Sequence, residues 1–170
     1  LTIFSTLPAI ADDGTLSFTP AVFAAGTADV TATAVDDGGT ANGGADRTTR
    51  SFHIVITSHN HAPTLTGIGD VSVNEDASAQ SIQWATSVGP GAPSESGQAV
   101  TLSLASTNPS LFSAQPALSQ TGLLTFTSAP DADGTANVTV TARDDGGTAG
   151  GGTDTTARTF TITVTPVNDA

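Results

Sequence analysis

The chain of 170 residues carries 16 acidic side chains against 4 basic ones, which gives a formal net charge of −12. So few cations cannot neutralise a phosphate backbone, and this excludes nucleic acid as a partner. The absence of cysteine excludes disulfides and cysteine-based zinc or redox chemistry. No apolar run reaches the roughly 18 residues that cross a bilayer, so no membrane partner is expected.

The first 62 residues align without a gap with residues 109–170, at a fixed offset of 108, and 33 of the 62 aligned positions are identical. A period of this length is that of a whole domain, not of a solenoid repeat. We therefore expect residues 63–170 to form one complete repeat. Residues 1–62 are expected to be the C-terminal half of another.

A half repeat on its own has an energetic problem. Without the first strands of its domain, its inward apolar residues lose their cover at about 1.5 to 3 kcal/mol each, roughly 10 kcal/mol together, which rivals the stability of a typical domain. We expect completion either by upstream residues of the same polypeptide or by another subunit, as in donor-strand assembly. The exposed residues would be Leu16, Phe18, Val30, Phe52, Ile54 and Ile56.

Alternation of apolar and polar residues with a period of two indicates β-strands in the complete repeat. About seven short strands separated by turn residues predict an all-β fold, an antiparallel Greek-key β-sandwich of the cadherin or immunoglobulin type in tandem domains. Trp84 is expected in the core. The glycine-rich loop 144–154 is too long for a tight turn and is expected to project from one end. The predicted strands are residues 70–73, 78–84, 99–105, 112–118, 123–127, 138–142 and 160–165.

Four short motifs mark the ends of the repeat: VNED at 73–76, PDAD at 130–133, ARDDGG at 142–147 and PVNDA at 166–170. They resemble the tandem cadherin-like repeats of very large bacterial surface proteins and adhesins, and the resemblance covers essentially the whole chain. It implies an extracellular, cell-surface array whose partners are neighbouring repeats or identical subunits. It also implies that calcium stiffens some of the junctions.

In the cadherin pattern, calcium lies between successive domains and is held by acidic residues from three loops and a linker. Calcium takes about six to eight hard oxygen ligands, which carboxylates meeting at one end of a sandwich can supply. Asp144 matches the residue that caps the preceding junction, and the others match the following one. The ligands implied by the resemblance are Glu75, Asp131, Asp133, Asp144, Asn168 and Asp169.

The half repeat departs from this pattern at three of these positions, which indicates that its own junction has lost the calcium site. His61 also opens an alternative, because His59 and His61, with His53 nearby and a carboxylate such as Asp36, are zinc ligands by type. The acidic residues of the two DDGG loops are expected to make local turns and not loop-only metal sites. The three substituted positions are Phe23, Ala25 and His61, in place of Asp131, Asp133 and Asp169.

No nucleophile elbow, phosphate-binding loop or cysteine nucleophile is present in the sequence, so no enzyme is expected. The sequence favours a structural, non-catalytic segment of an extracellular surface protein, either an adhesin stalk or a filament. Two alternatives remain. One is a subunit that polymerises by donor-strand complementation. The other is a module that binds a glycan or a protein through loops such as 89–97.

Overall fold

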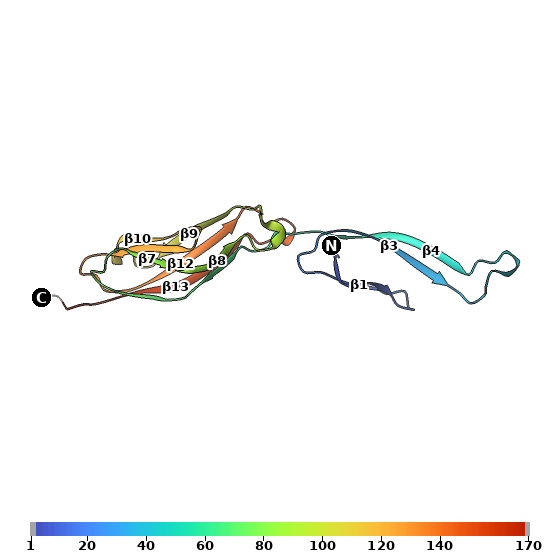
Figure 1. Ribbon diagram of the computed structural model, residues 1–170, viewed down its shortest axis with the longest axis horizontal. Helices are drawn as coiled ribbons and strands as arrows, with labels where there is room; N and C mark the ends of the chain where they lie inside the picture. Colours follow the sequence, from blue (N-terminus) through green and yellow to red (C-terminus); the bar gives the residue numbers. More distant parts are fainter. Residues whose placement is uncertain (1–2, 169–170) are drawn as a thin grey trace. The chain divides into compact units, whose positions relative to one another are not determined.

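The computed structural model describes residues 3–168 of the chain (Figure 1). The regular structure in this range consists of β-strands and short 3-10 turns, which confirms the all-β prediction. The range contains no helix long and apolar enough to cross a membrane. The chain divides into two compact units, Leu1–Ser58 and His59–Ala170, called here the first and the second unit.

Two antiparallel hairpins make up the first unit. The shorter hairpin joins β1 to β2, and the longer one, pale blue to cyan in Figure 1, joins β3 to β4. A 3-10 turn at Ala41–Gly43 lies within the loop of the longer hairpin. The strands are β1 (Phe4–Ile10), β2 (Leu16–Pro20), β3 (Gly26–Val35) and β4 (Arg47–Ile56).

The second unit contains nine strands within the described range. The predicted hairpin of residues 138–142 and 160–165 is present, and its two strands extend to 11 residues each. Two strands, β5 and β8, were not predicted. The elements are β5 (Thr64–Gly67), β6 (Val71–Asn74), β7 (Gln80–Gln83), β8 (Ala85–Gly89), β9 (Val100–Ser106), β10 (Phe112–Leu118), β11 (Leu123–Ser128), β12 (Gly134–Asp144) and β13 (Thr155–Thr165).

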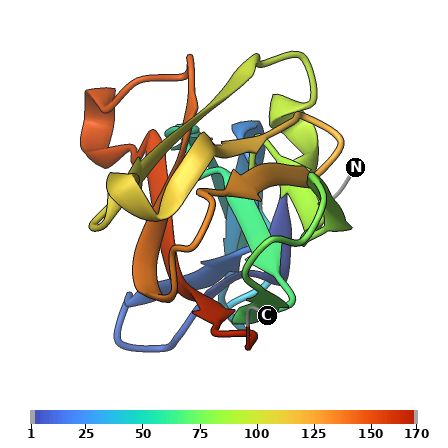
Figure 2. The same ribbon diagram turned by 90° about the vertical axis from the view of Figure 1, so that its left-hand side faces the viewer.

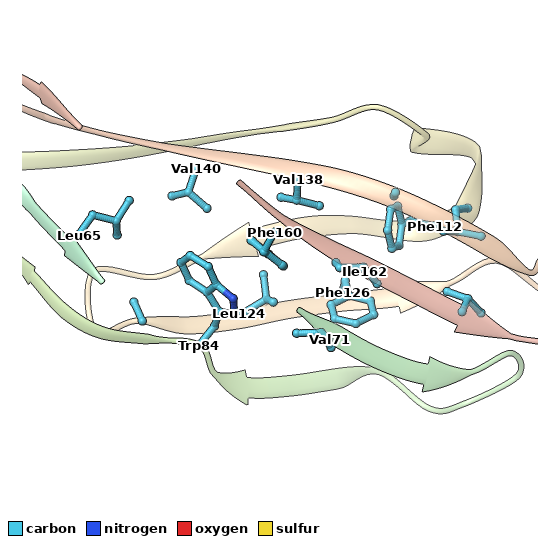
Figure 3. Close-up of a cluster of buried hydrophobic side chains, with 14 of the residues drawn as sticks. Leu65, Val71, Trp84, Phe112, Leu124, Phe126, Val138, Val140, Phe160 and Ile162 are labelled. Atoms are coloured by element: carbon cyan, nitrogen blue, oxygen red, sulfur yellow. The ribbon is translucent and has the colours of Figure 1, made fainter. Parts of the chain in front are cut away.

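These strands form a four-stranded sheet in the order β6-β13-β12-β9, a three-stranded sheet in the order β10-β11-β7, and the pair β5-β8. Side chains from all three sheets form one buried cluster (Figure 3), and Figure 2 shows the strands of this unit on opposite sides of it. Alternating positions of β12 and β13 point into this core, as period-two patterning predicts. The arrangement is consistent with a β-sandwich.

One strand pair departs from the antiparallel prediction. Strands β6 and β13 are parallel, with Val71 opposite Ile162 and Asn74 opposite Thr165. A parallel pair needs a long crossover connection, and the intervening strands of the unit supply one. The carbonyl of Thr165 continues the contact by accepting a hydrogen bond from the backbone N–H of Glu75 at 2.9 Å.

Trp84 lies in the core, as predicted, with 2% of its surface exposed. Its ring centroid is 4.4 Å from that of Phe160, and its indole N–H donates to the carbonyl of Gly69 at 2.8 Å. The backbone N–H groups of Trp84 and Ala85 both donate to the carbonyl of Gly122. This irregularity ends β7 and lets the chain leave β11 to pair with β5, so the predicted strand at 78–84 corresponds to β7 alone and β8 begins just after it.

The internal repeat extends to the register of the strands. The pair β10-β11 reproduces the pair β1-β2 at an offset of 108, including both bulges, and the pair β12-β13 reproduces β3-β4 at all ten paired positions. The positive φ of Phe23 and Asp131, 60° and 53°, also coincides. The two copies therefore have the same local backbone structure, although only the second copy pairs with further strands within the described residues.

Candidate functional site

The predicted calcium ligands of the following junction begin with Glu75, which directly follows β6. Its side chain is buried, and one carboxylate oxygen accepts a hydrogen bond from the backbone N–H of Val167 at 2.7 Å. Because Val167 precedes Asn168, this bond fixes the segment that leads out of β13. Glu75 therefore holds the start of the linker directly.

The other ligands at this end lie on exposed loops. Asp131 is held in a left-handed conformation, and its backbone N–H lies 3.5 Å from a carboxylate oxygen of Asp76. Asp133 and Asn168 are exposed, and Asp169 lies outside the described residues. Within residues 3–168 no three acidic or histidine side chains gather closely enough to hold a metal ion.

Asp144 lies at the other end of the second unit. It ends β12, whereas Asp131 and Asp133 precede the start of that strand, and an 11-residue strand spans about 30 Å. Asp144 therefore cannot share an ion with the other predicted ligands of its own repeat. Asp144 lies instead at the end where residues 59–62 enter the second unit, and its role as a calcium ligand stays a prediction.

At that entrance the side chain of Asn60 is inserted into the β12-β13 loop. Its amide N–H group donates to Asp144 at 2.7 Å and to the carbonyl of Thr153 at 2.9 Å, while its amide oxygen accepts from the side chain of Gln98 at 2.8 Å. The backbone carbonyl of Asn60 accepts from the N–H of Thr153. Both polar ends of this buried side chain are thus satisfied by the second unit.

Two glycines of the loop make room for Asn60. A Cβ at Gly146 would lie 2.0 Å from the amide oxygen of Asn60, and a Cβ at Gly152 would lie 3.0 Å from its backbone nitrogen. Asp144, Gly146, Gly152 and Thr153 form what we call the asparagine socket. Sequence reasoning missed Asn60, although one signal was available, because Asn60 aligns with Asn168 of the linker motif.

The asparagine socket offers few free oxygen atoms for a calcium ion. Two buried oxygens, the second carboxylate oxygen of Asp144 and the amide oxygen of Gln98, lack a hydrogen-bond partner among the described residues. Asp145 accepts from the N–H of Ala99, and Asp154 pairs with Arg143 at 3.1 Å. Two oxygens fall short of about six ligands, so these residues alone do not fit a calcium ion.

Next to the asparagine socket, His61 binds Glu95 of the segment after β8. The backbone N–H and the ring Nδ1 of His61 lie 3.0 and 2.9 Å from the same oxygen of Glu95, and the other oxygen accepts from the N–H of Ala92 at 3.0 Å. Burial acts to raise the pKa of Glu95, but the hydrogen bonds from His61 and Ala92 outweigh it and lower the pKa. The loop 89–97 therefore contacts the linker.

The three histidines are divided between the units. His53 pairs with Asp29 of the first unit at 2.6 Å, whereas His61 pairs with Glu95 and stacks against His59 with ring centroids 4.8 Å apart in the second unit. His61 takes the position that Asp169 has one repeat later. At this position His61 forms hydrogen bonds to a carboxylate, whereas one repeat later Asp169 itself provides a carboxylate.

No family model matches this chain, and no curated protein matches its sequence.

Proposed function

We propose that this chain is a structural, non-catalytic segment of an extracellular bacterial surface protein, built from tandem Greek-key repeats of the cadherin or immunoglobulin type. Its work is to space and stiffen an adhesin stalk or a surface filament. The observation that carries the proposal is the recurrence of the same strand registers 108 residues later. Recurrence of whole structural modules is the hallmark of an array.

The asparagine socket supports a load-bearing role for the linker. Asn60 contributes three side-chain hydrogen bonds and is buried, and His61 adds a direct contact with Glu95. A linker that is hydrogen-bonded to the domain that follows it has less freedom of backbone rotation, so it can transmit force to that domain. In this proposal residues 59–62 are held on the second unit by direct hydrogen bonds and need no metal ion for it.

The junction after β13 is proposed to use calcium. Glu75, Asp131, Asp133, Asn168 and Asp169 would supply oxygens, and a following repeat would add the equivalent of Asp144. With about 10 mM calcium and a site of about 1 mM affinity, the stabilisation is only about 1.4 kcal/mol. We expect a small rise in the melting temperature of the second unit with calcium, lost in D131N/D133N and kept in D145N.

Single-molecule force spectroscopy tests the mechanical role. The full chain is placed between reference domains and stretched from its two ends. We expect the second unit to unfold in one cooperative event, with a contour-length increase of roughly 35 nm for its extended residues. A chain that extends without a discrete event would contradict a load-bearing role, as would specific binding on a glycan array.

A further inference from the structure

Four of the six apolar residues predicted to lose their cover are not exposed: Ile54 is buried, and Val30, Phe52 and Ile56 are half-buried. The other two are exposed, although their counterparts in the second unit are buried. Leu16 and Phe18 are 37% and 38% exposed, whereas the equivalent Leu124 and Phe126 are 0% and 2% exposed. Between the two hairpins of the first unit lies a groove of about 530 Å³. We call it the open groove; its apolar lining includes Ile10, Leu16, Val30, Ala32 and Ala34.

The second unit provides an internal template for what covers this lining. There, β7 pairs with β11, β9 pairs with β12, and β6 pairs with β13. The equivalents of β11, β12 and β13 are β2, β3 and β4, and each of these has a single strand partner in the described part of the first unit. Three strand edges and one apolar groove are thus free on the same unit.

We propose that the open groove and the free edges of β2, β3 and β4 form a strand-addition site for a polypeptide segment of the sequence type of residues 64–106. The inference rests on the repeat architecture of the proposed function and specifies its partner. Backbone edges give affinity, and pockets for alternate side chains give specificity, as in other strand-addition complexes. The template also fixes the register: the added counterpart of Ser81 lies opposite Ser17, because Ser81 lies opposite Thr125.

Two details of the first unit match this occupant. Phe52 is the counterpart of Phe160, which contacts the ring of Trp84, so an added tryptophan meets an aromatic ring. At Gly122 an added Cβ would lie 2.4 Å from the carbonyl oxygen of Ala85, whereas at its counterpart Gly14 nothing lies within 4 Å. The space that the incoming backbone takes in the second unit is therefore open in the first.

The choice of donor follows from what is free to pair. Charge does not decide it, because both Arg50 and Asp12 line the open groove. An intact second copy of the chain is a poorer donor. Its own segment is folded into the second unit, where Leu65 and Trp84 are each 2% exposed, and it would have to unfold that unit to donate.

The test adds a synthetic polypeptide of residues 63–107 to the full chain. We expect one segment to bind per chain, with slowed hydrogen exchange at the backbone amides of β2, β3 and β4 and no change in the second unit. The variant L16D, which places a charge in the open groove, should weaken binding at least tenfold. The control L7D makes the same change at an exposed leucine of β1 that does not line the open groove, and it should leave the affinity within twofold.

The register is tested by disulfide trapping, because the chain has no cysteine of its own. The variant S17C should crosslink to a segment carrying S81C and not to one carrying Q83C, whose template partner is Leu123, the counterpart of Thr15. Slowed exchange confined to the second unit, or no binding and no crosslink, would overturn the proposal. Self-association of the chain alone that L16D abolishes would overturn it too, in favour of a copy-to-copy interface.

These outcomes are separate from a failure of the proposed function. A chain that resists force through its second unit but does not bind the segment would leave the spacer role intact and remove only the strand-addition site. A chain that binds the segment in register but extends without a discrete unfolding event would remove the spacer role and leave the strand-addition site intact.

Discussion

The two units share strand registers, turns and loop glycines, yet they differ in their interiors. In the second unit, Leu124 and Phe126 of β11 are buried, whereas their counterparts Leu16 and Phe18 in the first unit are exposed. The hairpins fix their own registers through local turns, so they look alike in both units. A closed core needs strands from elsewhere in the sequence, and only the second unit has them in the described residues.

The largest expected difference between the units comes from truncating an equivalent leucine in each. L124A should lower the free energy of unfolding of the second unit by about 3 kcal/mol, because it leaves a cavity in a closed core. L16A, at the counterpart in the open groove, should cost less than about 1 kcal/mol, since little burial is lost. Urea titration followed by the fluorescence of Trp84 reports the second unit, and hydrogen exchange of β3 and β4 reports the first.

Equal losses in both units would mean that Leu16 is already covered in solution. That result would remove the contrast on which the open groove depends.

A glycine pair gives the next largest effect. G146A should destabilise the second unit by about 1 to 3 kcal/mol, because its new methyl group collides with Asn60 in the asparagine socket. G38A, the same change one repeat earlier, places its Cβ 3.0 Å from Asp36 and should cost less. Urea midpoints and the rate of proteolysis at residues 57–62 provide the measurements. If G146A left the urea midpoint unchanged, the asparagine socket would have room for an added methyl group, and the close contact with Asn60 would be contradicted.

Removing the amide of Asn60 is expected to cost about 1 to 3 kcal/mol, because it leaves the buried carboxylate of Asp144 without its shortest hydrogen bond. N168A, at the equivalent position, serves as the control and should cost less, because the side chain of Asn168 is exposed and that of Asn60 is buried. Calorimetric unfolding at neutral pH is the measurement. Similar costs for the two variants would argue against a special role for the asparagine socket.

The smallest effect concerns pH. The pKa of Glu95 is lowered from its ordinary value of 4.5, so the folded chain binds fewer protons at this group than the unfolded chain does. Its contribution to stability is therefore present above about pH 4.5 and disappears as the pH falls through the lowered value. E95Q should flatten the dependence of the urea midpoint on pH below that point. H53A, which alters a histidine pair of the first unit, should leave the dependence for the second unit unchanged.

Sequence patterning located the strands that alternate clearly. The hairpin of residues 138–142 and 160–165 was predicted because valine, isoleucine and phenylalanine alternate there with threonine. Strands β5 and β8 were missed because each is short and ends in glycine, with few apolar positions to show a period. The change of strand partner after Trp84 was not predicted, because it depends on the carbonyl of Gly122, far away in the sequence.

The candidate site was predictable in its residue types more than in its contacts. Glu75 and Asp144 were selected because they match acidic positions of the cadherin-like pattern, and both are buried with hydrogen-bond partners. Asn60 was missed because a lone asparagine in a linker has no local pattern. Its importance follows from the loop glycines it contacts, and those contacts bridge more than 80 residues.

The parallel pairing of β6 with β13 has a mechanical consequence. Strand β6 lies near the start of the second unit and β13 near its end, and both run in the same direction. Tension applied at the two ends of the unit therefore slides these strands along one another, and the hydrogen bonds between Val71–Asn74 and their partners are strained in shear together. Bonds that are loaded together resist far more force than bonds that open one after another, so β6 and β13 act as the mechanical clamp of the second unit.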